Sequence, residues 1–351
     1  MPAPGEAGAF IGTEAGALPL DRLEPWLRAK VEGFAGPLEV RRFKGGQSNP
    51  TFELETPRRS YVLRRKPEGK LLPSAHAVER EHRVIAALHP TGFPVARPYA
   101  LCEDPAVIGT AFYVMEKVEG RILWDGRLPE LSRDDRGAVV RAEIETLARL
   151  HTIEPGSVGL GAFGRPGNYF ARQVDRWSRQ YRASETHAVP AMDRLLEFLP
   201  ASVPADGPVA IVHGDYRLDN LILHPKRPEV AAVLDWELST LGDPLADFSY
   251  FLLQWVMPAE QRGGLAGLDL AEWGLPSIEQ AVEMYEALTG RTVGGLDWLF
   301  SYNLFRLAAI CQGIGGRVRD GTAASPQAGA MAARVGPLSE AAWGYARRAG
   351  A

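Results

Sequence analysis

Two carboxylates and an amide in the middle of the chain have a spacing that suits phosphoryl transfer. Asp215 stands five residues before Asn220, and Asp235 follows after an apolar run. In such chemistry one carboxylate accepts a hydroxyl proton, while an amide and another carboxylate hold the metal ion on the nucleotide phosphates. The pattern predicts Asp215 as the general base and Asn220 and Asp235 as ligands of Mg²⁺, an ion that prefers oxygen donors.

Each of these residues taken singly is a common turn former, so the prediction depends on the joint pattern. Short β runs over residues 209–212 and 230–234 directly precede the two carboxylates, which are therefore expected in loops at strand ends. We interpret His213 as hydrogen-bonding support for the first loop. Arg217 is a candidate contact to the transferred phosphoryl group, and a solvent-facing side chain is the equally weighted alternative.

A glutamate lies within the apolar stripe of a predicted helix. The helix is expected to start after Ser74 as its N-cap and to end near Leu88, with Glu81 among its apolar positions. A carboxylate at such a position is costly unless a cation meets it. We therefore expect a positive side chain to face Glu81.

The cation predicted opposite Glu81 is Arg64, on a strand expected over residues 61–65. Neighbouring Arg65 and Lys66 are alternatives, although strand alternation turns Arg65 to the other face. A purely structural buried ion pair is the competing interpretation of Arg64 and Glu81.

A glycine-containing turn precedes this strand. The turn lies between strands expected over residues 38–43 and 51–54, and its backbone N–H groups could contact phosphates. An ordinary hairpin is the commoner explanation of a Gly-Gly pair, and only its position before Arg64 and Glu81 favours a phosphate loop. The residues concerned are Gly45, Gly46, Gln47, Ser48 and Asn49.

The surrounding elements predict an α+β fold with two lobes. The strands above, with runs over residues 99–103 and 111–115, indicate a small antiparallel sheet. Helical patterns dominate from Gly120 onward, including a helix that Ser277 and Gln280 open as a capping box. We expect a flexible leader over residues 1–20, an N-lobe over 21–116 whose first helix Asp21 caps, and a mainly helical C-lobe over 117–351.

Composition and charge exclude several classes of function. The chain of 351 residues, 46% apolar and 23% charged, is long enough for two cores. Its net charge of -4 gives no reason to expect nucleic acid or an anionic membrane as partner, and no apolar run approaches the roughly 18 residues of a membrane span. Cys102 and Cys311 are the only cysteines, which favours a reducing cytoplasm. Nothing in the sequence defines the oligomeric state.

The central spacing resembles that of protein kinases, and its wording, His-Gly-Asp and Asp-Trp-Glu, resembles the aminoglycoside phosphotransferase and choline kinase family of small-molecule kinases. Residues 61–64 resemble the kinase strand that carries a phosphate-binding Lys, and residues 78–81 resemble the family's helix motif. The resemblance implies a protein-kinase-like fold, ATP as cofactor, and Arg64 paired with Glu81 beside the α- and β-phosphates. Arg in place of Lys is a departure that keeps the charge and changes the geometry.

The same resemblance implies further roles. Residues 115–118 would connect the lobes and offer the backbone of Glu116 and Val118 to adenine, and Asp247 would hold the catalytic loop. The wording around the motifs resembles one branch, the kinase domains found with acyl-CoA dehydrogenases, for which hydroxyacyl substrates are implied.

We therefore expect an ATP-dependent phosphotransferase that acts on a small-molecule alcohol, with a hydroxyacyl-CoA-like acceptor. A nucleotide-binding pseudokinase, a metal-dependent hydrolase and an aminoglycoside or choline kinase are the alternatives. A polycationic aminoglycoside would favour a strongly acidic C-lobe, which the charges after Glu116 do not provide. A basic helix face could meet an anionic substrate, although a solvated face is the commoner explanation. Its residues are Arg172, Arg176 and Arg179, with Arg165 and Arg182 nearby.

Overall fold

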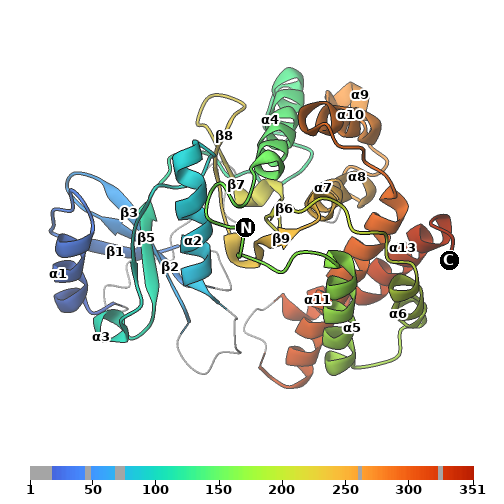
Figure 1. Cartoon of the computed structure of the whole chain (residues 1–351), viewed down its shortest axis with the longest axis horizontal. Coiled ribbons are helices and arrows are strands. Elements are labelled where there is room, and N and C mark those ends of the chain that lie inside the picture. Colours follow the sequence, from blue (N-terminus) through green and yellow to red (C-terminus); the bar gives the residue numbers. More distant parts are fainter. Residues whose placement is uncertain (1–17, 44–48, 68–75, 260–262, 323–326) are drawn as a thin grey trace.

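The protein has a small sheet-containing N-lobe and a larger helical C-lobe, as Figure 1 shows. The computed structural model describes residues 18–43, 49–67, 76–259, 263–322 and 327–351. The N-lobe sheet is antiparallel throughout and is ordered β1-β2-β3-β5-β4, which confirms the predicted small antiparallel sheet. Its strands are β1 (Glu39–Arg42), β2 (Thr51–Glu55), β3 (Ser60–Arg65), β4 (Pro98–Cys102) and β5 (Phe112–Glu116).

Helices cover both faces of this sheet, with α1 and α2 on opposite sides (Figure 1). Side chains alternate along β3, so Tyr61 and Leu63 pack in one core with α1, whereas Val62 packs in the other core with α2. Arg64 follows Val62 at the strand period and therefore faces α2. The helical segments of this lobe are α1 (Leu20–Lys30), α2 (Val78–Leu88), the 3₁₀ turn η1 (His89–Thr91) and α3 (Pro105–Ile108).

Two predicted helix starts were wrong. Asp21 lies in the first turn of α1 and does not cap it, because Pro19 occupies the N-cap position. Helix α2 begins at Val78 after Ala77, without a side-chain cap, and Ser74 lies outside the described residues. Residues 1–17 of the predicted leader and residues 44–48 of the glycine-containing turn also lie outside them.

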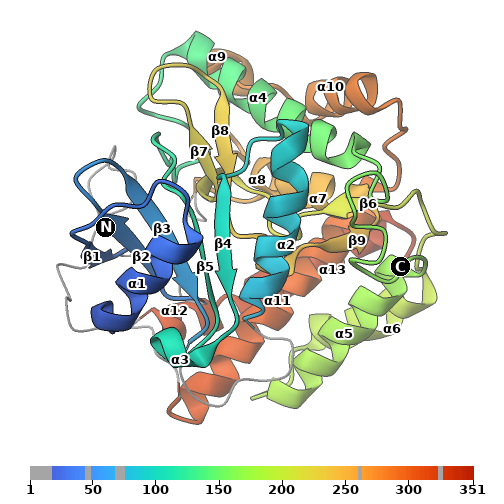
Figure 2. The same ribbon diagram turned by 60° about the vertical axis from the view of Figure 1, so that its left-hand side comes forward.

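The C-lobe is built around α11, which packs against α5, α7 and α13. Figure 2 shows α11 running beside α13, with α5 next to it. The predicted capping box of α10 is present, with Gly290 ending the helix in the left-handed conformation. The helices are α4 (Arg133–Thr152), α5 (Tyr169–Ser184), α6 (Pro190–Ala201), α7 (Pro244–Phe251), α8 (Leu253–Val256), α9 (Leu270–Trp273), α10 (Ile278–Thr289), α11 (Leu296–Arg319), α12 (Ala328–Ala332) and α13 (Val335–Arg348).

Two antiparallel sheets of two strands each carry the candidate catalytic loops of the C-lobe. Strand β6 (Ala210–Val212) pairs with β9 (Thr240–Gly242), and β7 (Leu221–Leu223) pairs with β8 (Val230–Val233). Short 3₁₀ turns, η2 (Leu218–Asn220) and η3 (Trp236–Leu238), lie in the intervening loops. No helix in the described part of the chain has the length and apolar character that a membrane crossing needs.

Candidate active site

The loop that carries Asp215 is held at its start by a buried carboxylate. Asp247, in the first turn of α7, accepts hydrogen bonds from the backbone N–H groups of His213 and Gly214, the latter at 2.7 Å. Gly214 has a φ of 85°, and a Cβ there would lie 2.8 Å from the carbonyl oxygen of Leu238. The fit therefore requires glycine. These contacts confirm the prediction that Asp247 holds the loop.

His213 connects the two catalytic loops. Its Nδ1 accepts a hydrogen bond from the backbone N–H of Asp215 at 3.2 Å, and its Nε2 lies 2.7 Å from the carbonyl oxygen of Leu234. Because a carbonyl can only accept, the ring is the tautomer with its proton on Nε2. His213 is thus a support and not a base, as the sequence predicted.

Both carboxylate oxygens of Asp215 have donors. The hydroxyl of Tyr250 donates to Oδ1 at 2.7 Å. Oδ2 accepts from Nε of Arg217 at 3.2 Å and from Nδ2 of Asn220 at 3.0 Å. Arg217 also pairs with Asp219 at 3.2 Å. Its guanidinium therefore lies beside Asp215 and is not simply a solvent-facing group. Asp215 is thereby fixed in orientation within a network of polar donors.

Strand register brings Asn220 next to Asp235. In the β7–β8 pair Leu221 lies opposite Val233, and the backbone N–H of Leu234 donates to the carbonyl of Asn220 at 2.8 Å. Asp235 then turns away from the strand in the left-handed conformation, with a φ of 62°. The pairing of the two strands thus places Asn220 and Asp235 beside each other.

These donors fit the Mg²⁺ that the sequence predicts. Among the described residues there is no group of three or more His, Cys, Asp or Glu that could hold a metal ion by itself. An amide and one carboxylate suit an ion that takes its other ligands from water and from nucleotide phosphates. A protein-only site such as that of zinc is not supported by this arrangement.

Arg64 forms the ion pair predicted with Glu81 and reaches a second carboxylate. Its Nε lies 2.8 Å from Oε2 of Glu81, and a terminal nitrogen lies 2.6 Å from Oδ1 of Asp235. Glu237 is more distant, at 3.9 Å. Lys66, one of the alternatives, pairs instead with Glu79 at 2.9 Å. Arg64 therefore connects the N-lobe helix to the predicted metal ligand.

Glu81 is almost fully buried, with 1% exposure. Its Oε1 accepts from Nδ2 of Asn49 at 2.6 Å, and its Oε2 accepts from the hydroxyl of Tyr113 at 3.2 Å. Burial raises the pKa of Glu81, and the Arg64 guanidinium opposes that rise. The side chain of Asn49, which we expected in the phosphate loop, thus supports Glu81. Gly45, Gly46, Gln47 and Ser48 lie outside the described residues.

The connector between the lobes starts at the end of β5. Glu116 pairs with Tyr61 across the sheet, and its N–H donates to the carbonyl of Arg97 at 2.8 Å. Any adenine contact of Glu116 would therefore have to use its carbonyl oxygen. Val118 is partly buried two residues later. The adenine roles of Glu116 and Val118 stay predictions.

A cavity of about 270 Å³ opens beside Asp215. Arg217, Tyr250 and Arg306 provide polar groups to its wall. The rest of the wall is mainly apolar and includes Trp124, Leu253, Met257, Ile310, Cys311 and Leu338. The cavity is therefore suited to a small molecule with a large apolar part.

Sequence reasoning missed Tyr250 and Arg306. Tyr250 follows Asp247 by three residues on α7, so helical spacing could have placed it on the loop-facing side. Arg306 donates to the carbonyl of Gly214, and its guanidinium lies 5.0 Å from the centre of the Tyr250 ring. No local pattern marks Arg306, because it reaches the loop from the middle of α11.

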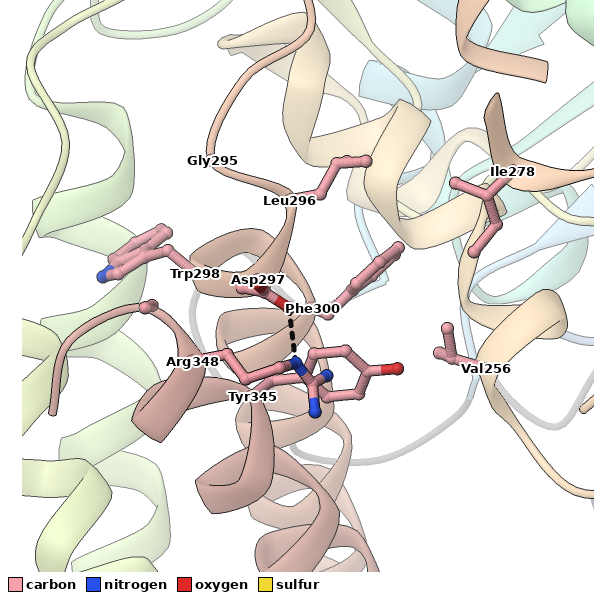
Figure 3. A pocket seen from close by; sticks show the side chains of 10 residues that line it. Val256, Ile278, Gly295, Leu296, Asp297, Trp298, Phe300, Tyr345 and Arg348 are labelled. Carbon is pink, nitrogen blue, oxygen red and sulfur yellow. Dashed lines mark hydrogen bonds and ion pairs between the residues drawn. The ribbon is translucent and has the colours of Figure 1, made fainter. Parts of the chain in front are cut away.

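A larger cavity, about 570 Å³, lies elsewhere (Figure 3). It is situated between the start of α11 and the end of α13, where Asp297 and Arg348 form an ion pair at 2.9 Å. None of its lining residues belongs to the cavity beside Asp215. Size alone therefore does not identify the candidate site, which is the smaller cavity.

The basic face of α5 is occupied by local contacts. Arg172 donates to the backbone carbonyls of Gly167 and Arg165. Arg182 pairs with Glu185 at 3.0 Å and with Asp193 at 2.9 Å. These contacts favour a structural role over the anionic-substrate interpretation.

Comparisons with known proteins agree with this geometry. Residues 39–285 match the model of the phosphotransferase enzyme family. A mouse protein named acyl-CoA dehydrogenase family member 10 is 42% identical over 95% of this chain, and a chicken protein named acyl-CoA dehydrogenase family member 11 is 42% identical over 91%. The chain spans only 32% and 42% of the length of these two relatives.

Solved structures show the same fold. A Ralstonia eutropha protein whose name proposes an aminoglycoside phosphotransferase is 50% identical, with a TM-score of 0.87 over 94% of this chain and 99% of its own. A thermostable mutant of the aminoglycoside phosphotransferase APH(4)-Ia, in complex with ADP and hygromycin B, has a TM-score of 0.60 at 15% identity over 94% of this chain and 98% of its own, a likeness of fold alone. The chain therefore belongs to the phosphotransferase enzyme family and has the kinase-like fold of the aminoglycoside phosphotransferases.

Proposed function

We propose that this protein transfers the γ-phosphoryl group of ATP to the hydroxyl of a small molecule. The observation that carries the proposal is the convergence of three groups: Asp215 faces a cavity, Asn220 and Asp235 are adjacent through strand register, and Arg64 reaches Asp235 at 2.6 Å. This set matches what phosphoryl transfer requires, namely a base, oxygen ligands for a metal ion and a cation near the phosphates.

In the proposed reaction Asp215 orients the acceptor hydroxyl and takes its proton. The acceptor oxygen forms a bond to the γ-phosphorus while the bond from that phosphorus to the bridging oxygen of ADP breaks, so ADP leaves. Mg²⁺, held by Asn220 and Asp235, would neutralise charge on the phosphates. Arg217, beside Asp215, would offer a positive charge to the transferred group.

ATP is proposed to lie between the lobes. Its phosphates would contact Arg64 and the backbone of residues 45–49, and its adenine would contact Glu116 and Val118. The ADP complex of the APH(4)-Ia mutant supports nucleotide use by this fold. We assign the boundary between the N-lobe, residues 21–116, and the C-lobe, residues 117–351, to this connector.

The acceptor is proposed to be a hydroxyacyl-CoA-like molecule. The largely apolar cavity suits an acyl chain, and two relatives carry acyl-CoA dehydrogenase names. The cavity wall carries the cations Arg217, Arg306 and Arg334 beside the carboxylates Asp215 and Asp219, so it is not the acidic site that a polycationic aminoglycoside would favour. Because the thiols of Cys102 and Cys311 are both free and buried, we propose a reducing cytoplasm as the location.

ATP consumption by the purified protein tests the function. The acceptors to be screened are hydroxyacyl-CoAs, choline, sugars and aminoglycosides, with wild type, Asp215→Ala and Asp175→Ala compared. We expect turnover with hydroxyacyl-CoAs and a kcat about 10²–10⁴-fold lower for Asp215→Ala, the usual effect of losing a general base. Asp175 is exposed on α5, so its variant should match wild type.

Three outcomes would contradict the proposal. Normal turnover by Asp215→Ala would exclude Asp215 as the base. Binding of Mg²⁺-ATP without turnover of any acceptor would favour the pseudokinase alternative. Metal binding without ATP binding, seen in thermal-shift titrations, would favour the hydrolase alternative.

A further inference from the structure

The hydrogen bonds around Asp215 leave one side of its carboxylate for the acceptor. Each carboxylate oxygen has about two lone-pair positions. Oδ2 already accepts from Arg217 and Asn220, at 3.2 and 3.0 Å, so both of its positions are used. Oδ1 accepts a hydrogen bond from the hydroxyl of Tyr250, at 2.7 Å. An incoming hydroxyl is therefore directed to Oδ1, next to the tyrosine hydroxyl.

Tyr250 is itself fixed with respect to the catalytic loop. Its ring lies 5.0 Å from the guanidinium of Arg306, which is buried and donates to the carbonyl of Gly214. One turn earlier on the same helix, Asp247 holds the N–H groups of His213 and Gly214. Helix α7 thus contacts both the start of the loop and its reactive carboxylate.

We propose that Tyr250 is a positioning residue for phosphoryl transfer, which directs the open side of Asp215 Oδ1 toward the acceptor in the adjoining cavity. The inference rests on the proposed function. Tyr250 and Asp215 both line the cavity of about 270 Å³, so the phenol is placed where it can meet the acceptor oxygen as well. Burial and the charge of Asp215 raise the pKa of Tyr250, which keeps the phenol a donor at neutral pH.

The test is a double-mutant cycle between Tyr250→Phe and Asp215→Ala. Phenylalanine keeps the ring beside Arg306 and removes only the hydroxyl. The reaction measured is hydrolysis of Mg²⁺-ATP with water as the acceptor, under single turnover for the slow variants. We expect Tyr250→Phe to lower kcat about tenfold in the wild-type background, the effect of one hydrogen bond to a charged group, and less than about twofold in the Asp215→Ala background. The KM for ATP should not change.

Tyr285→Phe is the matched control. Its hydroxyl makes a buried hydrogen bond of the same length, 2.7 Å, to Nδ1 of His151. Tyr285 does not line the cavity, although the other ring nitrogen of His151 lies 3.5 Å from Asp247. The two variants should lose similar stability, whereas Tyr285→Phe should keep kcat within about twofold of wild type, because no contact to Asp215 is lost.

The outcomes separate this inference from the function on which it rests. An equal loss of kcat from Tyr250→Phe in both backgrounds would show a merely structural role and overturn the inference. An unchanged kcat in the wild-type background would do the same while leaving the proposed function intact. A wild-type protein that consumes ATP neither with water nor with any of the screened acceptors would refute the proposed function and the inference together.

Discussion

Truncation of Glu81 should cost the protein much of its stability. The carboxylate is 1% exposed, pairs with Arg64 at 2.8 Å, and accepts hydrogen bonds from Asn49 and Tyr113. Glu81→Ala would leave the buried guanidinium of Arg64 with Asp235 and the more distant Glu237 as its anions, and would leave the buried donors of Asn49 and Tyr113 without this acceptor. Removal of one partner from a buried pair typically costs about 3–5 kcal/mol. We expect a loss of that size in the free energy of unfolding.

The same helix offers a matched control. Glu79 lies two residues earlier on α2 and pairs with Lys66 at 2.9 Å, nearly the same length. Its side chain is 36% exposed, however, and that of Lys66 is 25% exposed. Because both changes are Glu to Ala within one helix, the difference in helix propensity cancels. Glu79→Ala should cost less than about 1 kcal/mol, as partly exposed pairs do.

Urea unfolding at pH 7.5, followed by circular dichroism and tryptophan fluorescence, measures both losses. Non-coincident transitions would mean that the lobes unfold separately, and the N-lobe transition then gives the comparison. The reasoning would be refuted if the losses for Glu81→Ala and Glu79→Ala agreed within about 1 kcal/mol, since burial would then not decide the cost.

Two further predictions concern a buried acid and a glycine. Burial raises the pKa of Glu143 to about 8, from 4.5 in the unfolded chain, so the folded state holds the proton more tightly. The stabilisation from this proton is complete below pH 4.5 and is lost as the pH rises to 8, so the free energy of unfolding should fall by up to about 1.4 kcal/mol per pH unit in between. Urea titrations between about pH 5.5 and 7.5 should show that this decline is absent from Glu143→Gln. Equal slopes for the variant and wild type would contradict this. Gly214→Ala should lower kcat and reduce the free energy of unfolding by about 1–3 kcal/mol, because the new Cβ would meet the Leu238 carbonyl. Gly290 also has a positive φ but has nothing within 4 Å of a built Cβ, so Gly290→Ala should cost less. Equal losses of stability would contradict the steric argument.

The pairing of Arg64 with Glu81 could be predicted because both positions follow from periodicity. Alternation along β3 turns Arg64 to the side of Val62, and the helical stripe of α2 turns Glu81 toward the same core. Because a carboxylate at an apolar position needs a cation, the positive charge of its partner could be predicted as well. The same kind of local information placed Asp215 and Asp235 at strand ends.

What the sequence did not reveal depends on contacts between distant segments. Asn49 and Glu81 are 32 residues apart, and Tyr250 and Asp215 are 35 apart. No period relates such residues, so only the packed fold shows that they meet. The strands β7 and β9 have three residues each, too few for alternation to be recognised. The start of α1 was misplaced because Pro19, and not a polar side chain, precedes it.

The arginine at position 64 is the departure that made a pseudokinase a serious alternative, and the geometry weakens that reasoning. Arg64 contacts Glu81 through Nε and Asp235 through a terminal nitrogen, 2.8 and 2.6 Å away. A guanidinium presents these donors in a fixed planar fork, whereas an ammonium is a single point charge. Arginine can therefore contact the helix glutamate and Asp235, the proposed metal ligand, at the same time, and it keeps a permanent charge where the phosphates are proposed to lie. Arg64 thus carries the same charge as the family's lysine and forms a direct ion pair between the lobes.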